Sequence, residues 1–221
     1  MSGLGYLSWR RQRWMVLAAL ALVAFYACTA AVRSPLLAGM VMRAGAFVEP
    51  GLVLPLFFGA CWAAPLLARE QQHGTVDLAY TQSVSRLAWL VAWVAPVLVA
   101  AVAAAVAISV AFELLIEPGE SYAVWYGGLA EAPARIGYVL LAVSIGLFAG
   151  AVIGRTVPAV AATVAGFLTL PYAVRIAVVG GDFRVEPAGW WKYWFDLVPT
   201  GGTAAVLLVA AAVQMTRRVP A

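Results

Sequence analysis

The residues of this chain that could do chemistry are concentrated in one polar stretch, from Arg69 to Arg86. The stretch holds the only histidine of the sequence, His73, together with acids, amides, hydroxyls and a glycine, and it separates two long apolar runs. A single histidine excludes a multi-histidine metal site. A serine nucleophile would need a base, and none is placed in an apolar run. The composition of this stretch therefore favours contact with a partner over catalysis.

The sequence also lacks the motif that binds ATP phosphates. It contains no G-x-x-x-x-G-K-[ST] pattern, and its only lysine, Lys192, follows no glycine-rich turn. We therefore expect this chain to have no catalytic residues, no metal and no cofactor of its own, and not to be an enzyme. Cys28 and Cys61 lie in apolar runs with no partner pattern, so we expect them to pack as small apolar side chains.

The composition is that of a polytopic membrane protein. Hydrophobic residues make up 64% of the chain and charged residues 11%, which is more apolar surface than one soluble core could bury. The whole chain, 1–221, is predicted to form one all-α membrane domain, whose spans are each near the ~20 residues that cross a bilayer core. The six predicted transmembrane helices cover residues 14–32, 51–68, 87–116, 136–154, 157–179 and 203–215.

Arginines at the ends of the spans indicate the topology. Three arginines lie within residues 1–13, and Arg217 and Arg218 follow the last span, so the positive-inside rule places both termini in the cytoplasm. This accounts for the net charge of +4 without nucleic acid. Residues 1–13 also carry tryptophans and predict an interfacial helix, which we favour over a signal peptide. The aromatic residues of 180–199 predict an outer amphipathic or re-entrant element before the sixth span.

Two patterns within the spans suggest contacts between helices. Gly146, Gly150 and Gly154 recur at every fourth position, which clears one helix face, and packing within the chain is favoured over a dimer seam. Glu113 and Arg175 are predicted at the same outer depth, so an ion pair between them is one hypothesis. Independent snorkelling of the two charges to the headgroups is the alternative.

The polar stretch and its flanks resemble ABC type-2 exporter permeases, the membrane subunits of ATP-driven transporters. After W-A-A-P-L-L-A the chain reads R-E-Q-Q-H-G-T-V-D-L-A-Y-T-Q-S-V-S-R, which is similar to the first intracellular loop of that family. There, a glutamate, G-T, a hydrophobic stretch and S-R precede the third span. The likeness is to the short actinobacterial permeases in particular. R-T-V-P-A-V-A-A-T-V-A-G-F, at the start of the fifth span, also fits the family.

The resemblance implies that residues 69–86 form a cytoplasmic coupling helix between spans 2 and 3. This helix would dock on a separate ABC ATPase subunit, which holds ATP and Mg. Gln72 stands where relatives often carry a second acid. The residues expected at the ATPase contact are Glu70, Gly74, Thr75, Asp77, Leu78, Tyr80 and Arg86. The second and fifth spans would line the transport path, with candidate residues Phe57, Phe58, Trp62, Thr163, Phe167, Thr169 and Tyr172.

The function that the resemblance implies is that of a permease subunit in the plasma membrane. It would pair with a second permease copy or a paralogue, and would move a hydrophobic or amphiphilic substrate, such as an antibiotic, peptide or lipid, outward. Two alternatives remain from other classes of protein. One is a secondary carrier, which the missing core acids and internal repeats disfavour. The other is a non-transporting membrane anchor or sensor of an ATPase complex.

Overall fold

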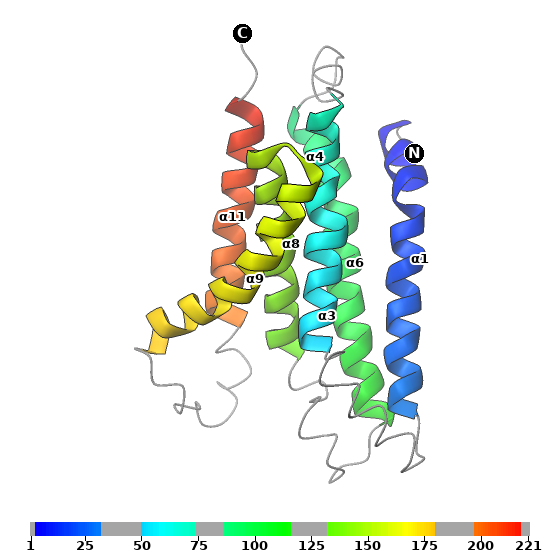
Figure 1. The fold of residues 1–221 in the computed structure, drawn as a ribbon. Helices are drawn as coiled ribbons and strands as arrows, with labels where there is room; N and C mark the ends of the chain where they lie inside the picture. Colours follow the sequence, from blue (N-terminus) through cyan, green and yellow to red (C-terminus); the bar gives the residue numbers. More distant parts are fainter. Residues whose placement is uncertain (1–2, 32–49, 74–85, 116–131, 180–196, 218–221) are drawn as a thin grey trace.

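The computed structural model is an elongated bundle of helices (Figure 1). The structure describes residues 3–31, 50–73, 86–115, 132–179 and 197–217. Every element in these ranges is helical, which confirms the all-α class. The elements are α1 (Gly3–Ala31), α3 (Pro50–Leu56), the π-helix η1 (Phe57–Ala63), α4 (Ala64–Gln72), α6 (Arg86–Leu115), α8 (Ala132–Ile153), α9 (Thr156–Val179) and α11 (Leu197–Arg217).

Each predicted span overlaps a helix of the structure. Within the described residues, four helical stretches are long and apolar enough to cross a membrane. These stretches are Leu52–Gln72, Ala88–Leu114, Ala132–Ile153 and Leu197–Met215. Two shorter apolar helices, Gln12–Cys28 and Thr156–Leu170, overlap the first and fifth predicted spans. The protein is therefore a membrane protein by length and composition, and the arrangement as six spans stays a prediction.

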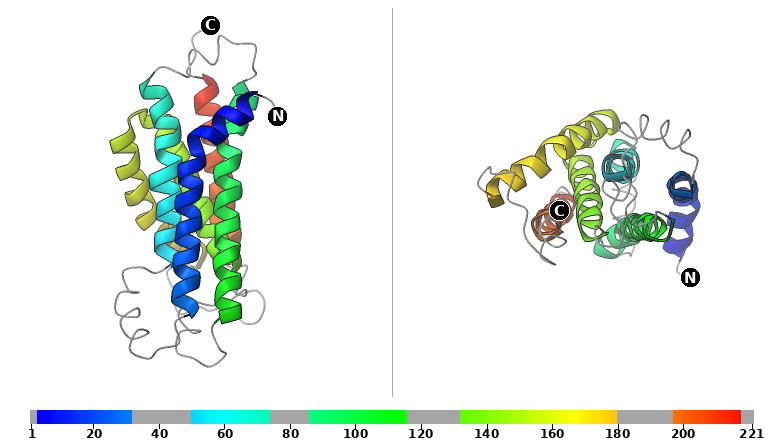
Figure 2. Two further views of the ribbon diagram at one scale, coloured as in Figure 1. Left: turned by 90° about the vertical axis from the view of Figure 1, so that its right-hand side faces the viewer. Right: turned by 90° about the horizontal axis from the view of Figure 1, so that it is seen from below.

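α8 is the central helix of the bundle. It packs against α3, η1, α4, α6, α9 and α11, and the view along the bundle in Figure 2 shows it enclosed by them. Residues 141–147 are all buried, which requires neighbours on every side of the helix. This agrees with a sequence that is apolar around its whole circumference, as expected for a helix covered on all faces.

Glycines let α8 approach the backbone of η1 and α4. A Cβ atom on Gly150 would lie 2.7 Å from the carbonyl oxygen of Ala64, and one on Gly146 would collide with the carbonyl oxygen of Gly59. The same close approach is found from the side of η1, because a Cβ atom added to Gly59 would lie 2.5 Å from the carbonyl oxygen of Ala142. The predicted use of the glycine stripe for packing within the chain is confirmed for Gly146 and Gly150.

The π-helix η1 lies in the middle of the second predicted span. Its turns are wider than those of an α-helix, and the N–H of Ala64 donates to the carbonyl oxygen of Gly59, five residues earlier. Pro55 and Pro65, neither of which has an N–H to donate, flank this segment. The wide turn holds Gly59 against α8, so η1 contributes directly to the closest helix contact of the bundle.

α1 packs chiefly along α6. Near one end of this contact Tyr26 meets Phe112 edge to face, with 6.5 Å between ring centroids. Toward the other end, Gln12 Nε2 donates to the carbonyl oxygen of Trp93 at 3.3 Å. α1 is helical without a break from Gly3, and its first turns bend toward α6 in Figure 2 (left). The interfacial position of residues 1–13 stays a prediction.

Two predicted elements fall largely outside the described residues. Residues 74–85 make up most of the predicted coupling loop, and residues 180–196 make up most of the predicted outer aromatic element. Cys28 and Cys61 are both free, and both are exposed on the surface of the chain, so the expectation that they pack in its interior is wrong.

Candidate coupling site

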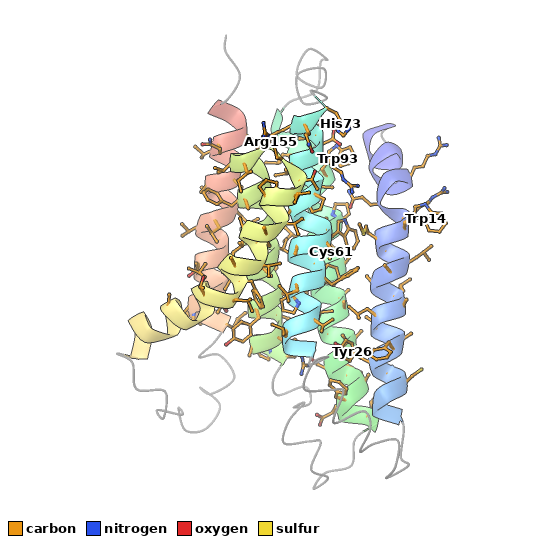
Figure 3. All side chains as sticks on the ribbon, in the orientation of Figure 1. Trp14, Tyr26, Cys61, His73, Trp93 and Arg155 are labelled. Atoms are coloured by element: carbon orange, nitrogen blue, oxygen red, sulfur yellow. The ribbon has the colours of Figure 1, made fainter. Side chains whose placement is uncertain are left out.

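The residues that lead into the predicted coupling loop lie at one end of the bundle. α4 finishes there, and the backbone N–H of His73 donates to the carbonyl oxygen of Arg69 at 3.1 Å. The Nδ1 atom of His73 lies 2.8 Å from the same oxygen. Figure 3 shows His73 and Arg155, from the turn between α8 and α9, at this same end. The start of the loop is therefore an ordered helix terminus beside other helix termini.

Gln71 connects the end of α4 to two other helices. Its Nε2 donates to the carbonyl oxygen of Ala151 in α8 at 2.9 Å. The same nitrogen lies 3.0 Å from the sulfur of Met215 in α11, a side chain that is only 3% exposed. A single amide thus contacts the last turn of α8 and the last turn of α11.

Gln72 connects the end of α4 to the beginning of α9. Its Oε1 accepts hydrogen bonds from the Thr156 hydroxyl at 2.9 Å and from the Thr156 N–H at 3.4 Å. The first N–H groups of a helix have no partner within it, so this amide acts as a cap supplied by a different helix. The departure from the family pattern at this position therefore has a structural role.

The turn between α8 and α9 depends on Gly154. Its φ of 66° is the only positive value among the described residues, and glycine adopts this region without steric cost. The Gly154 N–H donates to the carbonyl oxygen of Gly150 at 3.1 Å and closes α8. A Cβ atom here would lie 2.6 Å from Oε1 of Gln71. Gly154 thus permits both the turn and its close contact with α4.

Together these contacts form what we call the interlock, defined by Gln71, Gln72, Gly154 and Thr156. It joins the start of the predicted coupling loop to α8, α9 and α11 through side-chain hydrogen bonds. The backbone packing of α4 on α8 at Gly150 adjoins it. The interlock therefore holds the end of α4 against α8, α9 and α11.

The residues predicted to contact an ATPase are only partly described. Glu70 is 4% exposed and lines a pocket between α1, α4 and α6. Arg86 begins α6, and its side chain is outside the described part. The other five predicted contacts, which are Gly74, Thr75, Asp77, Leu78 and Tyr80, lie outside the described residues. Contact of this set with an ATPase stays a prediction, and Glu70 faces the inside of the chain here.

The predicted path residues of the second span lie on η1. Phe58 and Trp62 are buried and stack on each other, with 5.6 Å between centroids and 18° between ring planes. Phe57 is half-buried and meets Phe58 edge to face at 5.2 Å. Within one chain, therefore, Phe58 and Trp62 belong to the packed interior.

The predicted path residues of the fifth span lie on α9 and differ in exposure. Phe167 is buried, and so is Thr163, whose hydroxyl donates to the carbonyl oxygen of Ala159 at 2.7 Å. Thr169 is exposed, with its hydroxyl bonded to its own helix. The Tyr172 side chain is outside the described part. Trp62, one of the seven path candidates, lines a pocket that is described below. The transport path itself stays a prediction.

The hypothesis of a Glu113–Arg175 ion pair is not tested by the described residues. Glu113 is exposed near the end of α6, and the Arg175 side chain is outside the described part. The structure instead places a different arginine inside the bundle at that end, Arg135 of α8, which is 6% exposed. Its guanidinium donates to the Ser109 hydroxyl of α6 and lies 5.7 Å from the ring centroid of Phe112. Sequence reasoning missed Arg135 because an arginine at the beginning of a span is ordinarily expected to reach the headgroups.

Comparison with known families identifies the class of this protein. A family model described as ABC-2 membrane transporter related matches residues 42–179, which is more than half of the chain. The chain therefore belongs to this family, and the resemblance to ABC-2 type permeases is confirmed. The matched region runs from before α3 to the end of α9, and it includes all four interlock residues and three of the four helices that the interlock joins, which are α4, α8 and α9. No curated protein and no solved structure matched the chain.

Proposed function

We propose that this chain is the permease subunit of an ATP-driven ABC exporter that moves a hydrophobic or amphiphilic substrate outward. Membership of the ABC-2 family supports the transporter class. The observation that carries the proposal is the interlock, because it gives the predicted coupling loop a direct connection to the helices of the bundle. ATP and Mg would be held by a partner ATPase in the cytoplasm, and two permease copies, or this chain and a paralogue, would complete the complex.

The proposed mechanism begins with an ATPase subunit that binds residues 74–85. Closure of the ATPase on ATP would displace the end of α4, where this segment begins. Since α4 packs on α8 at Gly150 and is bonded to Thr156 of α9, the three helices would move together. The second and fifth predicted spans, which carry the path candidates, would thereby change their position relative to the partner permease. This is a rigid-body transition of packed helices, in which interface contacts rather than single side chains change.

The test is co-expression of the tagged chain with its neighbouring gene products, followed by identification of any ABC ATPase among the proteins that co-purify. We expect the ATPase to co-purify, and Tyr80→Asp, which places a charge in the predicted docking segment, to abolish this. Gln72→Leu should leave co-purification intact and lower the ATP-driven transport rate in proteoliposomes several-fold, because it cuts the link to α9. Gln214→Leu, a half-buried glutamine on α11, is the matched control and should leave both unchanged.

Three results would count against the proposal. Failure of any ATPase to co-purify contradicts the coupling of this chain to ATP. Co-purification without ATP-dependent transport supports a membrane anchor or sensor instead. Transport driven by an ion gradient with no ATPase present would establish a secondary carrier.

A further inference from the structure

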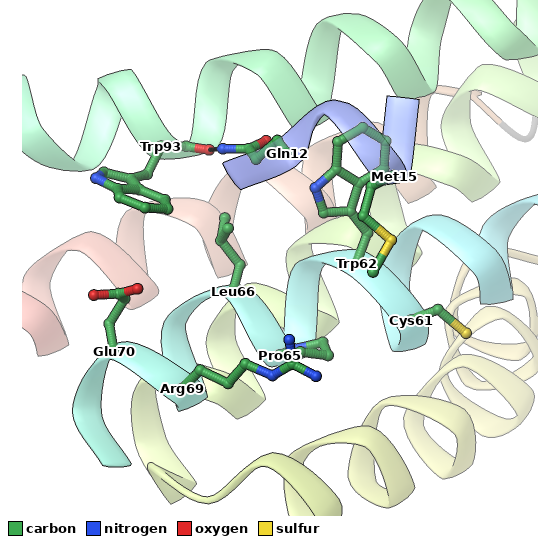
Figure 4. A pocket seen from close by; sticks show the side chains of 9 residues that line it. All are labelled: Gln12, Met15, Cys61, Trp62, Pro65, Leu66, Arg69, Glu70 and Trp93. Carbon is green, nitrogen blue, oxygen red and sulfur yellow. Dashed lines mark hydrogen bonds between the residues drawn. The ribbon is translucent and has the colours of Figure 1, made fainter. Parts of the chain in front are cut away.

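A pocket of about 70 Å³ lies between α1, α4 and α6, separate from the interlock (Figure 4). α1 packs mainly on α6 rather than on η1 and α4. The pocket lies between α1 and these two helices. Cys61 and Arg69 line it and are also exposed, so the pocket opens at the side of the bundle. In a membrane, this side faces lipid rather than water.

The deeper part of the pocket contains a polar atom that lacks a partner among the described residues. Trp62 is 2% exposed, and its Nε1 is buried without a hydrogen-bond acceptor. In Figure 4 this nitrogen is on the edge of the ring that faces the other lining residues. Trp62 lies inside the apolar stretch Leu52–Gln72, where no bulk water can accept its proton. A buried N–H in such surroundings favours a ligand with an acceptor oxygen.

The shallower part of the pocket is charged. Arg69 follows Trp62 by seven residues, which is about 10 Å along a helix, and lies close to the end of α4. An exposed guanidinium at this depth suits a phosphate group in the headgroup layer.

We propose that this pocket binds the polar part of a membrane phospholipid whose acyl chains are joined by ester bonds. The phosphate is held by Arg69, and a glycerol ester carbonyl accepts the hydrogen bond of Trp62 Nε1. In such a lipid the ester carbonyls lie on the acyl-chain side of the phosphate, which is the order in which the helix presents the two residues. The acyl chains extend sideways past Cys61, which lines the pocket and is exposed, into the bilayer. The site does not depend on coupling to an ATPase.

The experiment compares two lipids that differ only in the proposed acceptor. The full-length chain is placed in nanodiscs containing equal parts of diester phosphatidylethanolamine and its diether analogue, which has no carbonyl. Native mass spectrometry after release into detergent then counts the phospholipid retained by each protein. We expect the unmodified chain to retain the diester about fivefold over the diether, the effect of one ordinary hydrogen bond.

Variants assign the effect to the two residues. Trp62→Phe keeps the ring without the N–H and should retain the two lipids equally, whereas Trp14→Phe, on an exposed tryptophan of α1, should keep the preference. Arg69→Gln should lower retention of both lipids about tenfold. Equal retention of both lipids by the unmodified chain overturns the proposal. The same preference in Trp62→Phe also overturns it. If Trp62→Phe fails to fold, the comparison of the two lipids on the unmodified chain still tests whether an ester carbonyl is recognised.

Discussion

The contact between α8 and α4 at Gly150 gives the sharpest test of the fold. Replacing Gly150 with alanine would place a Cβ atom 2.7 Å from the carbonyl oxygen of Ala64 and 3.3 Å from the nitrogen of Ala68. Both neighbours are backbone atoms, so no flexible side chain can move aside. The two helices must therefore separate locally, and contacts along their interface are lost.

The expected change in the free energy of unfolding follows from two opposing effects. Alanine is favoured over glycine within a helix by up to about 1 kcal/mol. Overpacking a close contact costs about 1–3 kcal/mol, and here the backbone itself must shift. Gly202 on α11 is the matched control, because nothing lies within 4 Å of a Cβ built there and the residue is exposed. Gly202→Ala should therefore be neutral or stabilising and Gly150→Ala less stable than it by about 1–3 kcal/mol, because the gain in helix propensity is common to both variants and cancels in the difference.

This difference is measured by thermal unfolding in detergent. Unfolding is monitored as the loss of the monodisperse peak in fluorescence-detected size-exclusion chromatography. For a chain of this length, 1–3 kcal/mol corresponds to a difference in Tm of roughly 2–12 °C between the two variants. A Gly150→Ala protein that melts at or above the temperature of Gly202→Ala would refute backbone contact between α8 and α4. It would also remove one of the two links on which the proposed transmission depends.

Three further tests examine single contacts of the described helices, each by the same unfolding assay. Gly154→Ala should lower the Tm more than Gly154→Asn, because asparagine tolerates a φ of 66° better; equal losses would show that the left-handed turn is not needed. Gln72→Leu and Thr156→Val should show a coupling of about 1 kcal/mol in a double-mutant cycle, and additive effects would mean that the hydrogen bond does not form. Ser109→Ala removes an acceptor of the buried Arg135 guanidinium and should cost about 1.5–3 kcal/mol; an unchanged Tm would contradict the buried placement.

The parts of the fold that could be predicted from sequence are those set by local chemistry. Long apolar runs must form helices in a membrane, because every backbone group has to be bonded within its own segment. The recurrence of Gly146 and Gly150 at every fourth position predicted a bare helix face and its use inside the chain, which the contacts with Gly59 and Ala64 confirm. The polar stretch predicted a break between the second and third spans, but its predicted start at Arg69 was too early, because α4 continues to Gln72.

The interlock could not be predicted in the same way, because its partners are far apart in the chain. Gln71 bonds to Ala151 and contacts Met215, which are separated from it by 80 and 144 positions. Nothing local to the sequence distinguishes this glutamine from a solvated one. The burial of Glu70 is a similar case, since an acid in a polar stretch is ordinarily exposed, and only the direction of α4 turns this one toward the inside of the chain.

The π-helix also limits how many residues this part of the chain can contain. Deleting one residue between Phe57 and Ala63 would let the segment wind as an ordinary α-helix, and the residues before it would rotate by about 100° relative to α4. Leu54, which is fully buried, would then leave the core, and Gly59 would lose its place against α8. Substitutions by residues of similar size can be accommodated one at a time here, whereas an insertion or deletion shifts every upstream contact at once. The segment is therefore constrained in length more strictly than in composition.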